Sequence, residues 1–97
     1  MNRITYLSVA EIELIEAALY YNEQQSGLGK DFLDAVGERE KVIQRDPELW
    51  TFFEEPIRGC RVQPFPYRLL YRVLPDRIQI VAVMHLSTHP DYWKNRI

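Results

Sequence analysis

The first half of the chain changes from a short strand pattern to a helical pattern. Residues 3–7 (RITYL) alternate apolar and polar side chains and are rich in strand-forming residues, so they predict a short strand. Residues 9–24 repeat apolar side chains at helical spacing, with Ile12, Ile15 and Leu19 on one stripe. This spacing predicts an amphipathic helix whose apolar face is that stripe.

Capping and turn residues mark the helix ends. Ser8 precedes Glu11 by three positions, which is the spacing of a capping box. Residues 26–29 (SGLG) break the first helix, and a second helical pattern covers residues 30–45. Its main apolar positions are Phe32, Val36 and Ile43. A proline at position 47 ends it, because the residue before proline is pushed out of the α region. So short a turn predicts an antiparallel helical hairpin.

The second half has the pattern of a sheet. Residues 48–56 (ELWTFFEEP) have no clear period, and their aromatic side chains either close the seam between helices and sheet or meet a partner. Residues 57–62 and 67–74 predict strands, and the almost wholly apolar residues 78–85 (IQIVAVMH) predict a central strand covered on both faces. The predicted fold is α+β, in the order β-α-α-β-β-β. One domain over residues 1–97 packs the helical hairpin on one face of a small, mostly antiparallel sheet.

Charge is divided unevenly along the chain. Residues 1–56 hold five basic and twelve acidic side chains, a balance of −7, and residues 57–97 hold seven and two, a balance of +5. Six of those seven are arginines, whose forked donors suit carboxylate or phosphate. Alternation puts Arg68 and Arg72 on one sheet face and splits Arg58 from Arg61. Either this arginine-rich face meets an anionic partner, or the arginines line the solvent-exposed side of the sheet.

Few side chains point to metal or redox chemistry. Cys60 is the single cysteine, so no internal disulfide is expected, and a small core or sheet residue is its simplest interpretation. His85 and His89 lie four residues apart, but no third ligand converges with them, so neither a metal nor another cofactor is expected. Neither a signal peptide nor a membrane-span pattern is present, which predicts a cytoplasmic protein.

Five segments, taken in order, resemble the RelE/ParE family of type II toxin–antitoxin systems. They are EIELIEAALYYNEQQSGLGKDFL, IRGCRV, FPYRLLYRV, IQIVAVMH and HPDYWKNR. The resemblance is to the ParE-like branch, whose members are often described as plasmid-stabilisation toxins. It implies a compact toxin that inhibits growth when free and is neutralised by a cognate antitoxin. Both a homodimer and a toxin–antitoxin hetero-oligomer are compatible with it.

The family combines two mechanisms on one scaffold. RelE-type members cut messenger RNA on the ribosome, whereas ParE-type members inhibit DNA gyrase without being nucleases. A metal-independent ribonuclease needs a base, an acid and cations at the phosphate. The candidates for these roles are Arg61, Arg68, Arg72, His85 and Tyr92. However, the sheet region has no lysine before Lys94, and the pI is near 5.6. The sequence therefore favours a gyrase inhibitor over a ribonuclease, with an inert antitoxin-binding remnant as a third alternative.

In a binding protein the same side chains form an interface. The residues expected to contact a target or an antitoxin are Arg58, Arg61, Arg68, Arg72, His89, Tyr92, Trp93 and Arg96. His85 has a structural alternative, a hydrogen-bonded residue at a strand end, and Tyr92 and Trp93 are alternatively a packing anchor. Arg96, next to the last residue, is expected to be the least constrained. A free sheet edge and the groove between the hairpin and the sheet are expected to receive an extended or helical segment of a disordered antitoxin, acidic where it meets the arginines.

Overall fold

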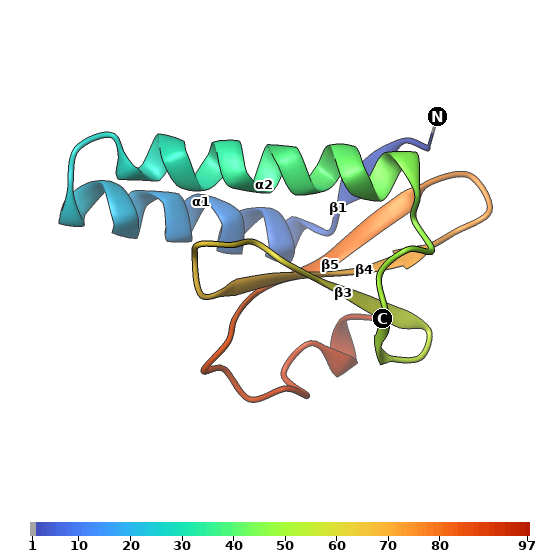
Figure 1. The fold of residues 1–97 in the computed structure, drawn as a ribbon. Helices are drawn as coiled ribbons and strands as arrows, with labels where there is room; N and C mark the ends of the chain where they lie inside the picture. The colour runs from blue at the N-terminus through green and yellow to red at the C-terminus, as the bar shows by residue number, and fades with distance from the viewer. Residues whose placement is uncertain (1) are drawn as a thin grey trace.

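The computed structural model describes residues 2–97, which form a helical layer on a sheet (Figure 1). Strand β1 (Ile4–Tyr6) leads into helices α1 (Ser8–Gln24) and α2 (Leu28–Arg45), an antiparallel hairpin that lies over one face of the sheet. The remaining elements are β2 (Phe52–Glu54), β3 (Ile57–Arg61), β4 (Tyr67–Val73), β5 (Ile78–His85) and the 3-10 helix η1 (Lys94–Arg96). The segment after β5 passes beneath the opposite face of the sheet (Figure 1).

The sheet has the order β1-β5-β4-β3-β2. Strand β1 runs parallel to β5, and every other pairing is antiparallel, so the predicted fold class is confirmed. Strand β5 is buried from Ile78 to Met84, as its continuous apolar run predicted. Strand β2 was not predicted, because three residues at a sheet edge are too short to show a period. Within residues 2–97, no helix has the length and apolar character needed to cross a bilayer.

Both faces of the sheet are covered by apolar side chains. On the helical side, Phe32 and Ile43 pack with Leu69 and Ile80. On the other side, a smaller cluster forms around Trp93 of the C-terminal segment. Its other buried members are Ile57, Leu70, Val81, Ala82 and Met84. The β4–β5 register skips one residue at position 81, and this bulge places two successive residues of β5 in the smaller cluster.

Helix α1 does not bury the stripe that its spacing predicted. Its buried residues are Ala10 and Ala17, whereas Ile12, Ile15 and Leu19 are exposed. Small alanines let the helix approach the sheet closely, so the larger aliphatic side chains lie on the outer side. In α2, by contrast, the predicted positions Phe32, Val36 and Ile43 are buried.

The ends of the hairpin are set by backbone geometry. The predicted capping box is wrong, because Ser8 already lies inside α1 and the capping position, Leu7, has no side-chain hydrogen bond. Gly27 has a φ of 90°, which glycine adopts without strain in the turn between the helices. At Gly29, a Cβ atom would lie 2.5 Å from the carbonyl oxygen of Ala18, so glycine allows α1 and α2 to touch here.

Candidate functional site

Two of the predicted arginines share one pocket. Arg61 of β3 and Arg68 of β4 are directly paired across the two strands, and both line a cavity of about 430 Å³. The aromatic segment that precedes β3 supplies the other wall, with Trp50, Phe52 and Phe53. We call this cavity the arginine pocket. The guanidinium carbon of Arg68 lies 5.3 Å from the centre of the Phe53 ring, a cation–π distance.

The arginine pocket has donors without acceptors. Within residues 2–97, neither Arg61 nor Arg68 forms an ion pair with a carboxylate. Nε of Arg61 and Nε1 of Trp50 are buried and meet no acceptor in this part of the chain. Buried donors without partners cost free energy, and two arginines directly opposite one another repel. An anionic group with several acceptor oxygens would relieve both penalties.

The other two sheet arginines are held by the fold. Arg58 lies on the opposite face of β3, as alternation predicted, and donates to the carbonyl oxygen of Trp50 at 2.7 Å. Its guanidinium carbon lies 4.0 Å from the centre of the Phe52 ring. Nε of Arg72 donates to Oε1 of Gln79 on β5 at 2.8 Å. These contacts occupy the guanidinium groups of Arg58 and Arg72 within the fold. Of the four predicted sheet arginines, Arg61 and Arg68 therefore remain as candidates for contact with a partner.

Arg96 is the most heavily constrained of the predicted site residues, contrary to expectation. Its two terminal nitrogens donate to both carboxylate oxygens of Glu13 at 2.9 and 2.7 Å. The first nitrogen also donates to the carbonyl oxygen of Val81 at 3.0 Å. The two charged side chains are only 13% and 19% exposed, and the guanidinium packs on the Tyr92 ring at 4.6 Å. The hydrogen bonds to Glu13 raise the pKa of Arg96 further.

This ion pair closes an open strand edge. Strand β1 pairs with β5 only as far as Ile80, so among residues 2–97 no strand pairs with the β5 backbone beyond this residue on that side. Oε1 of Glu13 accepts a hydrogen bond from the Val83 N–H at 3.0 Å, and the guanidinium group of Arg96 donates one to the Val81 carbonyl oxygen. The Glu13–Arg96 pair thereby bonds backbone groups of β5 that a neighbouring strand would otherwise pair with. Nothing in the sequence indicates this role for Glu13, because the two residues are 83 positions apart.

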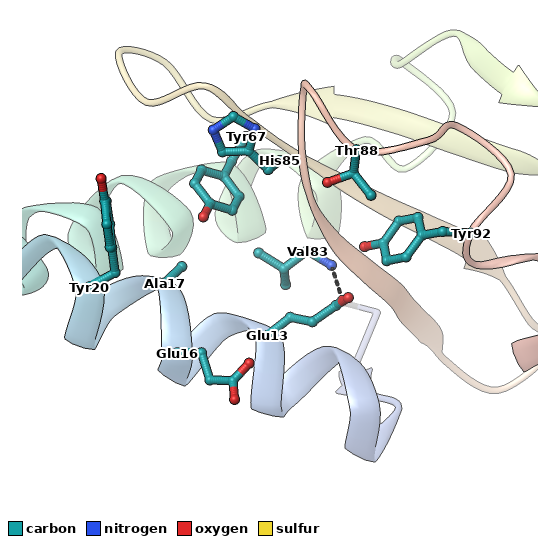
Figure 2. Close-up of a pocket in the computed structure, with 9 residues that line it drawn as sticks. All are labelled: Glu13, Glu16, Ala17, Tyr20, Tyr67, Val83, His85, Thr88 and Tyr92. Carbon is teal, nitrogen blue, oxygen red and sulfur yellow. Dashed lines mark hydrogen bonds between the residues drawn. The ribbon is translucent and has the colours of Figure 1, made fainter.

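A second cavity, of about 320 Å³, lies between α1 and the end of β5. Figure 2 shows Tyr67 and Tyr92 entering it from the sheet and from the C-terminal segment, with Tyr20 on the α1 side. We call it the tyrosine pocket. His85 packs against Tyr67 with ring centres 5.1 Å apart. Nδ1 of His85 accepts the Ser87 N–H at 3.0 Å, so Nε2 carries the proton of the neutral ring.

The tyrosine pocket is poor in positive charge. Glu13 and Glu16 line it, and among the described residues no lysine or arginine does. The neighbouring Arg96 packs on Tyr92 but is already paired with Glu13. Burial and the Glu13 carboxylate raise the pKa of Tyr92, so its phenol stays protonated well above neutral pH. The five candidate ribonuclease residues lie in three different places. Arg61 and Arg68 line the arginine pocket, and His85 and Tyr92 line the tyrosine pocket. Arg72 is hydrogen-bonded to Gln79 outside both pockets. The structure does not gather the five around one substrate.

The remaining candidates have local roles in the fold. Trp93 is buried, and its Nε1 donates to the carbonyl oxygen of Pro90 at 2.6 Å. His89 is exposed, and its Nδ1 accepts the Asp91 N–H at 3.2 Å. Burial raises the pKa of the Cys60 thiol to about 11, so the thiol is neutral and a poor nucleophile near pH 7. The part of the chain that the structure describes contains no cluster of three side chains able to hold a metal ion.

Comparisons with known proteins agree with the sheet and hairpin described above. The family model described as ParE toxin of type II toxin-antitoxin system, parDE, matches residues 4–90. No curated protein matches the sequence. The solved structure of the chromosomal ParDE TA system from P. aeruginosa has the same fold, with a TM-score of 0.77 and 15% identity over 90% of this chain and 98% of that chain. Because the family model spans most of its length, this chain belongs to the ParE toxin family of type II toxin–antitoxin systems.

Proposed function

We propose that this ParE-family toxin inhibits growth by binding DNA gyrase and that a cognate antitoxin neutralises it. The observation that supports a binding protein over a ribonuclease is the separation of Arg61 and Arg68 from the side chains that could transfer protons. Side-chain catalysis of RNA cleavage needs cations at the same phosphate whose neighbouring oxygens gain and lose protons. Here Arg61 and Arg68 line one pocket, whereas His85 and Tyr92 line another beside two glutamates.

The arginine pocket is the proposed contact with the antitoxin. Arg61 and Arg68 form no ion pair with the described residues, and their guanidinium groups suit a carboxylate of the partner. Forked hydrogen bonds from arginine match the spacing of carboxylate oxygens. The neighbouring rings of Phe52 and Phe53 provide an apolar wall. Arginine and large aromatic side chains together are typical of the residues that dominate interface energies. We infer that an acidic segment of the antitoxin occupies this pocket.

Two assays on the purified chain distinguish the mechanisms. We expect inhibition of DNA supercoiling by gyrase, and intact messenger RNA when primer extension is performed on a translating extract that contains the toxin. Messenger cleavage without supercoiling inhibition would overturn the proposal in favour of a ribonuclease. Neither activity would also contradict it, and would indicate a different target or an inert remnant that still binds antitoxin.

Charge reversal tests the antitoxin contact. For this test, the toxin is co-expressed with its cognate antitoxin, and the complex is recovered by affinity purification. Arg68→Glu, in the arginine pocket, is expected to reduce recovery of the complex strongly, because the pocket would then repel an acidic segment. Arg72→Glu is the matched control, since Arg72 bonds to Gln79 outside the pocket. Equal recovery of the two variants would show that the arginine pocket is not the antitoxin site.

A further inference from the structure

An apolar stripe covers the outer side of α1. Ile12, Ile15 and Leu19 recur at the spacing i, i+3, i+7 and are 54%, 51% and 59% exposed. They face away from the alanines that pack on the sheet. A helix at the surface of a globular protein normally places polar residues on its outer side. The stripe is therefore an exception that the packing of this chain does not explain.

A groove runs beside the stripe. It has a volume of about 350 Å³ and is lined by Ile15, Ala18, Leu19, Asn22, Gly29, Lys30 and Leu33. The one cation of this lining, Lys30, is paired with Asp34 at 2.8 Å. Because Gly29 has no side chain, the helices touch at this point, and two small residues, Ala18 and Gly29, leave space between the larger side chains of the groove. Such a groove accepts an aliphatic side chain from a helix that lies across the hairpin.

The charges around the stripe indicate which kind of partner could bind there. Helix α1 carries four glutamates, at positions 11, 13, 16 and 23, and neither lysine nor arginine. Glu11, Glu16 and Glu23 are exposed, and their carboxylates form no ion pair or hydrogen bond with the described residues. A second copy of this chain would bring the same glutamates against them, which is unfavourable. A partner with positive charge beside its apolar residues would be attracted.

We propose that the outer face of α1 binds an amphipathic helix of a partner protein, with aliphatic side chains along its centre and lysine or arginine along its margins. Its central side chains cover Ile12, Ile15 and Leu19, and one of them enters the groove beside Leu33. Its basic margin meets Glu16 and the neighbouring glutamates. This surface is distinct from the arginine pocket, which takes an acidic group, and the inference holds whether or not gyrase is the target.

A pair of synthetic helices tests the proposal. Both peptides carry leucines at i, i+3 and i+7; one has lysines along the margins and its twin has glutamates, and each is labelled for fluorescence anisotropy. The lysine peptide is expected to bind, and the glutamate peptide to bind at least about tenfold more weakly, with a difference that shrinks at high salt. Equal binding of the two peptides would overturn the proposal.

Matched variants locate the binding surface. Leu19→Lys is expected to weaken binding of the lysine peptide by about tenfold or more, because it removes a central apolar contact and adds a charge of the same sign as the peptide's. Leu49→Lys is the control, since Leu49 is also 59% exposed but lies outside the hairpin. Glu16→Lys should weaken binding of the lysine peptide and strengthen binding of the glutamate peptide. An equal loss with Leu49→Lys would contradict the proposed location, and so would a wild-type dimer that Leu19→Lys dissociates.

Discussion

Arginine has opposite roles in two regions of this molecule. In the arginine pocket, Arg61 and Arg68 face one another across two strands without a carboxylate among the described residues. At the C-terminal segment, Arg96 donates three hydrogen bonds and pairs with Glu13 while nearly buried. The first arrangement raises the free energy of the free toxin, whereas the second contributes to the fold. Residue type alone therefore does not separate the two kinds of arginine, whereas their partners within the described residues do.

Removing Arg96 should produce the largest change in stability. Arg96→Ala leaves a largely buried Glu13 carboxylate without its cation and the Val81 carbonyl without its donor, so we expect the free energy of unfolding to fall by about 3 kcal/mol. Urea denaturation measures the loss. The double variant with Glu13→Ala should be less destabilised than the sum of the single variants, since the two residues act as a pair. Additive losses would contradict the coupling.

High pH should weaken the same region by a smaller amount. Burial and Glu13 raise the pKa of Tyr92 in the folded state, so above the ordinary tyrosine pKa of about 10 the unfolded chain loses this proton while the folded chain keeps it. The contribution is fully present below pH 10 and is lost as the pH rises further. Between pH 8 and pH 11, the wild type should lose about 1 kcal/mol more than Tyr92→Phe in urea denaturation. Parallel losses in the two proteins would show that Tyr92 does not titrate differently on folding.

Changing the arginine pocket should alter stability least. Arg68→Gln removes one of two opposed like charges, so we expect a gain of a few tenths of a kcal/mol that disappears at high salt, because salt screens the repulsion in the wild type. Thermal denaturation at low and high ionic strength measures this effect. A loss comparable to that of Arg96→Ala would mean that Arg68 stabilises the fold, and the comparison between the two regions would fail.

Local patterns in the sequence predicted the strands and helices well. The residues of β5 form a continuous apolar run, and Phe32, Val36 and Ile43 of α2 recur at helical spacing, so their burial follows from the sequence. The outward stripe of α1 was misassigned, because periodicity finds an apolar face without showing which of two faces meets the sheet. Ala10 and Ala17 are small, and their weak signal was outweighed by larger side chains that remain exposed.

The candidate sites were less accessible to prediction than the fold. The type and alternation of the residues marked Arg61 and Arg68 as candidates, but their lack of a carboxylate partner depends on the whole structure. The pairing of Arg96 with Glu13 joins the C-terminal segment to the first helix. It also depends on where β1 ends, which decides how much of β5 needs another partner. Such long-range contacts leave no trace in local spacing.

The closure of the β5 edge by Arg96 has a consequence for how this toxin behaves in concentrated solution. An uncovered strand edge is a template on which an extended segment of another chain can pair. Proteolytic removal of Arg96 would expose the Val81 carbonyl and, once Glu13 lost its anchor, the Val83 amide. Loss of this one guanidinium group would therefore leave part of the β5 edge open to pairing with an extended segment of another chain.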